Sequence, residues 1–425
     1  MLSVKLHKWK KISSKTQASI YNKPAYVYIP LISQDDDNIT LLVKKGDYVY
    51  KGSIIARRKG NLRIPIHSSI SGTVVGFEEK YYQNGKLEKC IVIENDYKEK
   101  YQVNKGVKRN LTKYSKEEFI ELLKECGVVG LGGTGFPTYV KYSSKRKINT
   151  LIINAIEAEP YITCDSVLAA SKCEEILEAI DAIMEINQIP EAIIAVKKTN
   201  TELIHTINNF IGTYLRIKLV LVPDIYTLGY EKKLVQYLKH VSYQKYSMDV
   251  GIVVNNISTI YAIYQALKYQ HPLTERMITF TGDALKKPQN VIVKNGVLVE
   301  EVIEHIGGYK RDKKIQLIAG GPMMGRAIPS SDLVVTSNLN CVLVLKPNTG
   351  KEVNEVCVHC GKCVEYCPTR LSPVLIKEHL NHPKILKQLE PQRCIECGLC
   401  TYLCPSRIKV RDMVQEAKQK VGGSK

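Results

Sequence analysis

The sequence predicts a multidomain α/β protein, and three observations support this fold class. Residues 1–105 carry short apolar runs separated by Gly-Asp and Lys-Gly turns, a pattern typical of β modules. The middle of the chain alternates helical stretches with short apolar runs, which indicates an open α/β sheet. Near the C-terminus, eight of the 13 cysteines fall into two strings of identical spacing. Because 425 residues exceed the size of one ordinary core, we expect several domains.

The N-terminal 105 residues are predicted to form an all-β module. The run Leu42–Ala56 sets short strands between glycine turns, and Ile64–Val75 is typical of a strand, a turn and a second strand. This pattern resembles the barrel-sandwich hybrid of biotinyl and lipoyl domains. Those domains carry a lysine at a hairpin tip, whereas Ser68–Ser71 occupies the turn here. We therefore expect a structural or docking module and not an acyl carrier, with His67 in a structural role.

Residues 106–250 are predicted to form a central α/β domain. A capping box over Ser115–Glu118 begins one helix, and Thr150–Asn154 is a short apolar run typical of a buried parallel strand. A helix over Cys173–Glu185 precedes another strand at Ala192–Val196. This alternation favours a parallel sheet covered by helices.

Residues 251–345 are expected to continue the central domain and then to form a β-grasp-like subdomain. A strand over Val250–Val254 and a helix over Thr259–Lys268 come first. A β-rich stretch is expected after them, over Asn290–Val299, Val302–Ile306 and Ile315–Pro322. The segment Pro347–Lys351 is predicted to be a linker into a C-terminal module, and we assign residues 346–425 to that module.

The cysteine strings define the chemistry of the C-terminal module. Each follows C-x2-C-x2-C-x3-C-P, the ligand spacing of two-cluster ferredoxins, in which the fourth cysteine of each string binds the other cluster. One [4Fe–4S] cluster is therefore predicted to bind Cys357, Cys360, Cys363 and Cys404, and the second Cys394, Cys397, Cys400 and Cys367. Gly361 and Gly398 leave room for backbone N–H groups near the cluster sulfurs. Zinc sites need no third cysteine at this step and disulfide scaffolds belong to short secreted chains, so both alternatives are disfavoured.

The composition bounds the partners and the compartment. The net charge is +19, from 61 basic and 42 acidic residues, with lysine clusters at Lys5–Lys15 and Lys141–Lys147. This charge suits an anionic membrane surface or an acidic redox partner, or is only a solvated surface; no arginine-rich stripe predicts nucleic-acid binding. No signal-peptide pattern or long apolar stretch is present. We expect a cytoplasmic protein, at most peripheral to the membrane, whose remaining five cysteines are buried.

A glycine-rich loop and a pair of glutamates are candidates for a nucleotide site. Four glycines in Gly130–Gly135 permit positive φ and let successive N–H groups approach a phosphate, which Lys141 can neutralise. The loop is neither a Walker loop nor a clean G-x-G-x-x-G, so a tight structural turn stays an alternative. Glu157 and Glu159 follow an apolar strand, and the strand period directs both to one face, where they suit ribose hydroxyls or a nicotinamide. A solvated loop edge is the alternative for this pair.

Together these segments resemble the flavin and nicotinamide site of the NADH-oxidising flavoprotein subunit of respiratory complex I. That family's loop, strand and N-N-x-x-T element correspond to Gly130–Lys141, Asn154–Pro160 and Asn255–Thr259. The whole chain is similar to the C subunit of the Rnf ion-translocating ferredoxin:NAD oxidoreductase, with I-H-S-S-x-S-G, T-G-D-A and G-G-P-M-M-G motifs at Ile66–Gly72, Thr281–Ala284 and Gly320–Gly325.

Three departures from the Rnf pattern point to a related protein. Ala158 stands where that family has cysteine, Ile225–Lys233 resembles its K-Y-P-Q-G-A-E-K-Q stretch only loosely, and Val4–Lys10 replaces its G-G-I-H-P segment. These departures fit a soluble paralogue, the electron-transfer protein associated with D-proline reductase.

The resemblance implies an oxidoreductase that passes electrons between NAD(H), FMN and two [4Fe–4S] clusters to a protein partner, with no residue acting as a general acid or base. It implies FMN and NADH contacts from Gly132, Gly133, Gly135, Lys141, Asn154, Glu157, Glu159, Asn255, Asn256 and Thr259. The partner is either the membrane subunits of an Rnf complex or a soluble reductase. An iron–sulfur scaffold with a non-functional nucleotide site is the third hypothesis.

Overall fold

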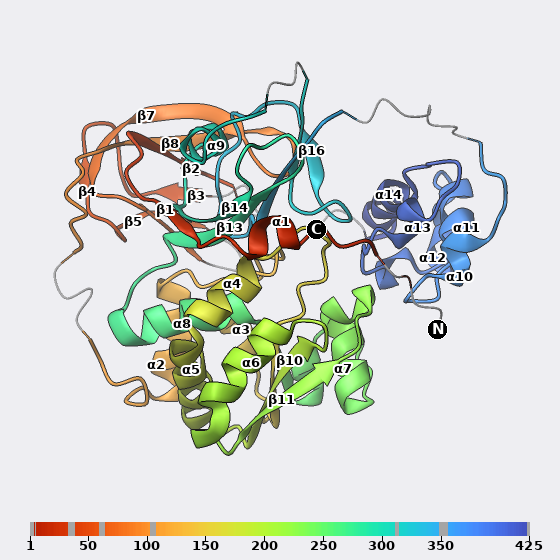
Figure 1. The fold of residues 1–425 in the computed structure, drawn as a ribbon, viewed down its shortest axis with the longest axis horizontal. Coiled ribbons are helices and arrows are strands. Elements are labelled where there is room, and N and C mark those ends of the chain that lie inside the picture. The colour runs from red at the N-terminus through yellow and green to blue at the C-terminus, as the bar shows by residue number, and fades with distance from the viewer. Residues whose placement is uncertain are drawn as a thin grey trace.

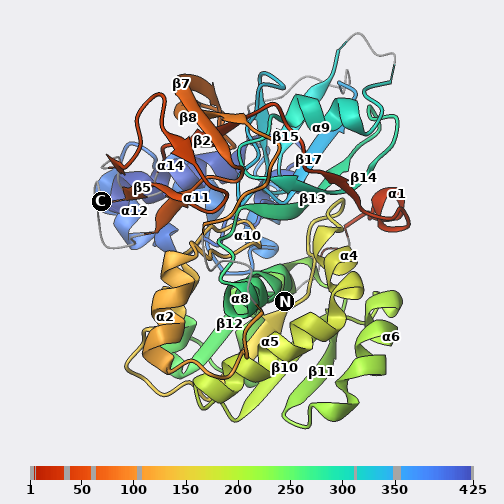
Figure 2. The same cartoon turned by 90° about the vertical axis from the view of Figure 1, so that its left-hand side faces the viewer.

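The structure is a computed structural model that describes residues 4, 6–32, 39–58, 64–102, 108–310, 314–347 and 356–422. Two β modules lie above an α/β unit, and a small helical module lies at one side, drawn in blue (Figure 1). Figure 2 shows the same two layers after a quarter turn, with α4 (Cys164–Ser171) and α8 (Ile257–Tyr269) where they meet. Most of the predicted linker Pro347–Lys351 lies outside the described residues.

The predicted N-terminal β module is present as two antiparallel sheets, of strand order β2-β8-β7-β4 and β3-β5-β6. Their strands are β2 (Tyr26–Pro30), β3 (Ile39–Leu41), β4 (Tyr48–Val49), β5 (Ile54–Arg58), β6 (Pro65–His67), β7 (Gly72–Tyr81) and β8 (Leu87–Asn95). The alternation in β2 turns Val27 and Ile29 into the core. The module does not include everything before residue 105, because α1 (Lys11–Ser14) and β1 (Ser19–Tyr21) pack on the second β module instead.

The central unit is a four-stranded parallel sheet of order β11-β10-β9-β12. Its elements are α2 (Lys116–Glu125), α3 (Thr138–Tyr142), β9 (Thr150–Asn154), α4, α5 (Cys173–Ile186), β10 (Glu191–Lys197), α6 (Thr201–Phe210), η1 (Ile211–Thr213), β11 (Ile217–Val222), η2 (Tyr226–Gly229), α7 (Glu231–Lys239), η3 (Ser247–Val250), β12 (Ile252–Asn256) and α8. The predicted capping box of Ser115 and Glu118 begins α2. Leu151 and Ile153 pack on the face that α5 and α8 cover, whereas Ile152 faces α7. Helices therefore cover both faces, as the sequence predicts.

The second β module is a six-stranded mixed sheet of order β1-β14-β13-β17-β15-β16. Its further elements are β13 (Glu275–Thr281), β14 (Gln289–Lys294), α9 (Val299–His305), β15 (Gln316–Ala319), β16 (Arg326–Ile328) and β17 (Cys341–Leu345). The expectation of β structure over Val302–Ile306 is wrong, because this segment belongs mostly to α9. Val299, Val302 and Ile303 recur at helical spacing and are fully buried, so the helical period outweighs the β propensity of valine and isoleucine.

The two β modules share one hydrophobic core, to which Ile55 and Phe280 both belong. The helical C-terminal module has a separate core that includes Leu386 and Val414. Its elements are α10 (Lys362–Glu365), α11 (Pro373–Glu378), α12 (Pro383–Gln388), η4 (Pro391–Arg393), α13 (Leu399–Tyr402) and α14 (Val410–Gly422). Within the described ranges, no helix is both long and apolar enough to cross a bilayer.

Candidate functional site

A cleft of about 770 Å³ opens at the carboxyl ends of β9 and β12. Parallel sheets bind ligands at this edge, and the volume lies within the range of about 300–1,000 Å³ typical of cofactor pockets. Nine of the ten predicted FMN and NADH contacts line the cleft: Gly132, Gly133, Lys141, Asn154, Glu157, Glu159, Asn255, Asn256 and Thr259. Gly135, the tenth, does not line it. The fold therefore brings together segments that are far apart in the sequence.

The glycine loop is a tight turn that also faces the cleft. The Gly130 N–H donates to the Phe136 carbonyl oxygen at 2.8 Å, and the Gly135 N–H donates to the Gly130 oxygen at 3.0 Å. Gly133 has φ +102 and Gly135 φ +62, values that favour glycine. The two interpretations of the loop are thus compatible, since the turn itself directs Gly132 and Gly133 into the cleft.

Two side chains from neighbouring elements fix the loop. The Leu131 N–H donates to the Thr259 hydroxyl at 2.9 Å, and the Leu131 oxygen accepts from the Arg276 guanidinium at 3.2 Å. Arg276 also donates to the Ser337 oxygen at 2.6 Å. Sequence reasoning missed this buried arginine; the signal was a charged residue inside the apolar strand β13. Arg276 ties the α/β unit to the second β module.

Lys141 lies in the cleft wall with its charge compensated. Its Nζ donates to the Glu231 carboxylate at 3.2 Å and to the Val254 oxygen at 2.5 Å. Burial alone would raise the pKa of Glu231, but the charge of Lys141 and hydrogen bonds from Ser247 and Tyr243 outweigh burial and lower it. Glu231, which sequence reasoning did not select, therefore orients the Lys141 ammonium group.

The asparagines stand side by side at the strand ends. Asn154 and Asn256 are partners in the pairing of β9 with β12. Asn154 donates to the Gly229 oxygen at 2.8 Å, and Asn256 donates to the Asp165 carboxylate at 2.6 Å while its own oxygen caps α8. Burial, followed by a neighbouring carboxylate, raises the pKa of Asp165. Asp165 also lines the cleft, and nothing in its local sequence pattern singled it out.

Glu157 and Glu159 both line the cleft, but the strand period that predicted a common face does not reach them. The strand ends at Asn154, so the period of two no longer applies at these residues. The Glu157 carboxylate accepts the Asp165 N–H at 2.7 Å, at the start of α4, and pairs with Lys10 at 3.1 Å. Neither glutamate is a solvated loop edge, because both are more than nine-tenths buried.

Glu159 holds a different segment, the loop Gly320–Gly325. Its two oxygens accept the Met323 N–H at 3.1 Å and the Met324 N–H at 2.9 Å. A Cβ at Gly321 would lie 2.4 Å from a Glu159 oxygen, so any larger residue there would displace the glutamate side chain. Burial raises the pKa of Glu159 to about 7, although both backbone donors oppose the shift. This carboxyl therefore titrates near neutral pH.

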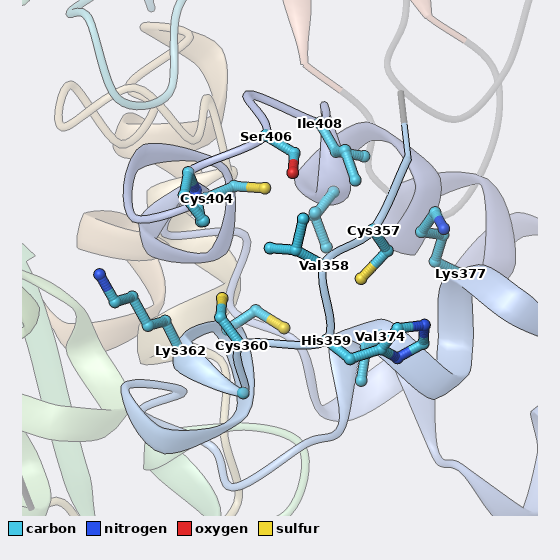
Figure 3. Close-up of a pocket in the computed structure, with 14 residues that line it drawn as sticks. Cys357, Val358, His359, Cys360, Lys362, Val374, Lys377, Cys404, Ser406 and Ile408 are labelled. Atoms are coloured by element: carbon cyan, nitrogen blue, oxygen red, sulfur yellow. The ribbon is translucent and has the colours of Figure 1, made fainter. Parts of the chain in front are cut away.

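The eight string cysteines surround two cavities in the predicted sets. Cys357, Cys360, Cys363 and Cys404 line the first cavity, where Figure 3 shows Cys357, Cys360 and Cys404 around a common space. Cys394, Cys397, Cys400 and Cys367 line the second cavity, which Cys363 also borders. Among the described residues, no three His, Cys, Asp or Glu side chains are close enough to hold a single metal ion. Ligation by these cysteines stays a prediction.

Backbone N–H groups near the cysteine sulfurs suit the binding of an iron–sulfur cluster. The Glu396 N–H donates to the Cys394 sulfur and the Leu371 N–H to the Cys367 sulfur, both at 3.3 Å. Such donors stabilise the negative charge of cluster thiolates. The five other cysteines are buried, as expected.

The cleft and the two cavities form a row. Ile395 and Glu396 line both the cleft and the second cavity, and Cys363 lines both cysteine cavities. Tyr226 and Tyr230, which sequence reasoning did not select, stand in the cleft wall on the side of the second cavity. Cys397 in the second cavity is buried, whereas Cys360 in the first is exposed. Of the two cysteine cavities, the first is thus the nearer to solvent.

Family models match four successive parts of the chain. Residues 3–98 match the RnfC barrel sandwich hybrid domain, 123–265 the Nuo51 FMN-binding domain, 277–327 the SLBB domain and 356–408 the 4Fe-4S dicluster domain. In fold, the chain resembles the crystal structure of an NAD+-reducing [NiFe]-hydrogenase in the air-oxidized state, with a TM-score of 0.52 and 17% identity over 73% of this chain and 63% of that chain.

Curated relatives match most of the chain. The C subunit of the ion-translocating oxidoreductase complex of Vibrio cholerae is 33% identical over 84% of this chain, which spans about half (47%) of that relative's length. The C subunit of the Na(+)-translocating ferredoxin:NAD(+) oxidoreductase complex of Acetobacterium woodii is 31% identical over 84% of this chain and 82% of its own length. The C subunit of the proton-translocating complex of Clostridium ljungdahlii is 32% identical over 86% and 81%, respectively. The chain therefore belongs to the family of C subunits of ion-translocating oxidoreductase complexes.

Proposed function

We propose that the chain is an electron-transfer subunit that binds FMN and NAD(H) in the cleft and one [4Fe–4S] cluster in each cysteine cavity. The observation that carries this proposal is the row of three sites, in which neighbouring sites share lining residues. FMN is needed because a nicotinamide gives two electrons together while each cluster accepts one.

The residues of the cleft would bind and orient the two cofactors, FMN and NAD(H). We propose that the N–H groups of Gly132 and Gly133 hold the FMN phosphate, with Lys141 as its positive charge. Asn154, Asn255, Asn256 and Thr259 would bound the rest of FMN, and Glu157 and Glu159 the side that NAD(H) enters. Gly135 would act only through the turn of the loop. Since both glutamates already accept backbone N–H groups, they would shape the NADH side of the cleft more than bind the ribose through free oxygens.

The partner and the domain limits belong to the same proposal. The relatives are named as subunits of complexes, so we propose that electrons pass between the exposed first cavity and a redox protein subunit at the cytoplasmic face of a membrane. The reverse direction uses the same row. We assign the four segments 1–105, 106–250, 251–345 and 346–425 as domains; the third continues the central domain with β12 and α8 before its β-rich part.

Anaerobic reconstitution with iron, sulfide and FMN, followed by NADH, tests this function in the visible spectrum. We expect the flavin band and the broad iron–sulfur absorbance to bleach together. Protein reconstituted without FMN is the control and should keep its iron–sulfur absorbance when NADH is added. Clusters that assemble while FMN washes away and NADH has no effect would contradict the proposal and favour a scaffold.

A further inference from the structure

The wall between the cleft and the second cavity contains two hydrogen-bonded tyrosines. Tyr226 belongs to η2, and Tyr230 precedes α7. The Tyr226 hydroxyl donates to the carbonyl oxygen of Cys397 at 2.9 Å and lies 2.8 Å from the Tyr230 hydroxyl, which is 2.8 Å from the Met324 sulfur. Tyr226 is only 3% exposed. The Tyr226 phenol is therefore buried where it meets a predicted cluster-ligand residue.

The available protons fix the direction of the hydrogen bond to Cys397. Each phenol has one proton, so two of the three contacts can carry one. A carbonyl oxygen only accepts, so Tyr226 donates to Cys397. The Tyr230 hydroxyl has two acceptors within reach, the Tyr226 oxygen and the Met324 sulfur, of which the thioether is the weaker. A phenol ordinarily keeps its proton at neutral pH, so each hydroxyl is available as a donor.

The hydrogen bond from Tyr226 to Cys397 acts on the loop of the second cavity through one peptide group. The Cys397 oxygen and the Gly398 N–H belong to the same peptide, and a hydrogen bond accepted at the oxygen polarises that peptide and strengthens the N–H as a donor. Gly398 has φ +77 and lies in the loop that lines the second cavity. Donors directed at cluster sulfurs stabilise the reduced, more negative cluster and so raise its reduction potential.

In the first cysteine string, the residues that correspond to Cys397 and Gly398 have different surroundings. Cys360 is exposed, and a Cβ on Gly361 would meet no atom within 4 Å. The two strings have the same spacing, but only the second has a buried phenol bound to its middle loop among the described residues.

We propose that Tyr226 is a positioning residue that raises the reduction potential of the cluster in the second cavity through the Cys397–Gly398 peptide. This inference rests on the proposed function for the presence of the clusters, and its test does not use NADH.

The test is an anaerobic redox titration with mediators and dithionite, followed by electron paramagnetic resonance. In Tyr226→Phe we expect the midpoint of one cluster to become more negative while the other midpoint and the iron content stay as in the parent. Tyr230→Phe keeps the hydrogen bond from Tyr226 to Cys397 but removes the neighbouring hydroxyl that contacts Tyr226. The same midpoint should therefore shift less than in Tyr226→Phe. Tyr402→Phe, at a tyrosine 52% exposed in the same string, is the matched control and should shift neither midpoint.

The remaining outcomes separate the two proposals. Unchanged midpoints in Tyr226→Phe, or equal shifts of both clusters, would overturn the role of Tyr226. Cys360→Ser, which removes a predicted ligand of the other cluster, identifies the midpoint that belongs to the second cavity. A parent protein that titrates normally but ignores NADH would contradict the proposed function and leave this result valid.

Discussion

At the scale of single residues, Lys141 offers a direct test of the cleft. Its ammonium group is held by Glu231 and the Val254 oxygen, so it is oriented before a ligand arrives. We expect Lys141→Ala to weaken FMN binding by about tenfold, roughly 1.4 kcal/mol, with cluster content unchanged. Fluorescence titration with FMN measures the change, and the exposed Lys145→Ala removes the same charge as a control. Equal affinities in both variants would remove Lys141 from the phosphate site.

Glu159 gives a prediction about pH at the same scale. Its pKa is raised from 4.5 to about 7, so this carboxyl stabilises the fold fully below pH 4.5, and the contribution is lost as the pH rises to about 7. The loss amounts to roughly 3 kcal/mol. Thermal unfolding followed by circular dichroism should therefore show a smaller fall between about pH 5 and about pH 7.5 in Glu159→Gln than in the parent. The exposed Glu117→Gln should behave as the parent, and an unchanged slope in Glu159→Gln would refute the assignment.

At the scale of elements, the loops before α10 and α13 form a matched pair. Gly361 and Gly398 have φ +73 and +77, so alanine strains both backbones alike, by about 1 kcal/mol. A Cβ at Gly398 would also lie 2.4 Å from the Met323 oxygen, whereas one at Gly361 meets nothing within 4 Å. We expect Gly398→Ala to lower the thermal midpoint and to slow cluster reduction by NADH, and Gly361→Ala to do much less. Similar losses in both variants would show that the contact with Met323 is unimportant.

Local patterns explain which elements the sequence could predict. Strand β9 and helix α5 were correctly predicted because their apolar residues follow one clear period over the whole element. Helix α9 was missed because its short run of valines and isoleucine has both β propensity and helical spacing. The composition of a segment this short cannot decide between them.

Long-range contacts explain what the sequence could not predict in the site. The two cysteine sets and the cleft residues were predictable, since motif spacing and family resemblance carry that information. The partners of Glu159 were not, because Met323 is 164 residues away and only the fold brings them together. The same holds for the bond from Arg276 to the glycine loop and for that from Tyr226 to Cys397. These contacts join different modules, which no local period encodes.

At the scale of the whole molecule, the row of sites predicts an order of electron transfer. The second cavity borders the cleft, and the first, with its exposed Cys360, lies beyond it. Cys360→Ser should damage only the cluster of the first cavity, here called the outer cluster. NADH should then still bleach the flavin and the cluster of the second cavity, the inner cluster, while reduction of a one-electron protein acceptor is lost. Cys367→Ser damages the inner cluster, so both the iron–sulfur bleaching and the acceptor reduction should fail. Anaerobic stopped-flow spectroscopy of the reconstituted protein separates these signals.

Two controls complete the test of this order of electron transfer. Ferricyanide, a small acceptor that can reach the flavin directly, should be reduced at the parental rate in both variants, which separates a broken path from a lost flavin. Cys173→Ser changes a buried cysteine of α5, remote from the row, and should leave every signal unchanged. If Cys360→Ser abolishes bleaching of the inner cluster as completely as Cys367→Ser does, electrons do not enter through the second cavity. The path to the partner would then have to leave the cleft at another face.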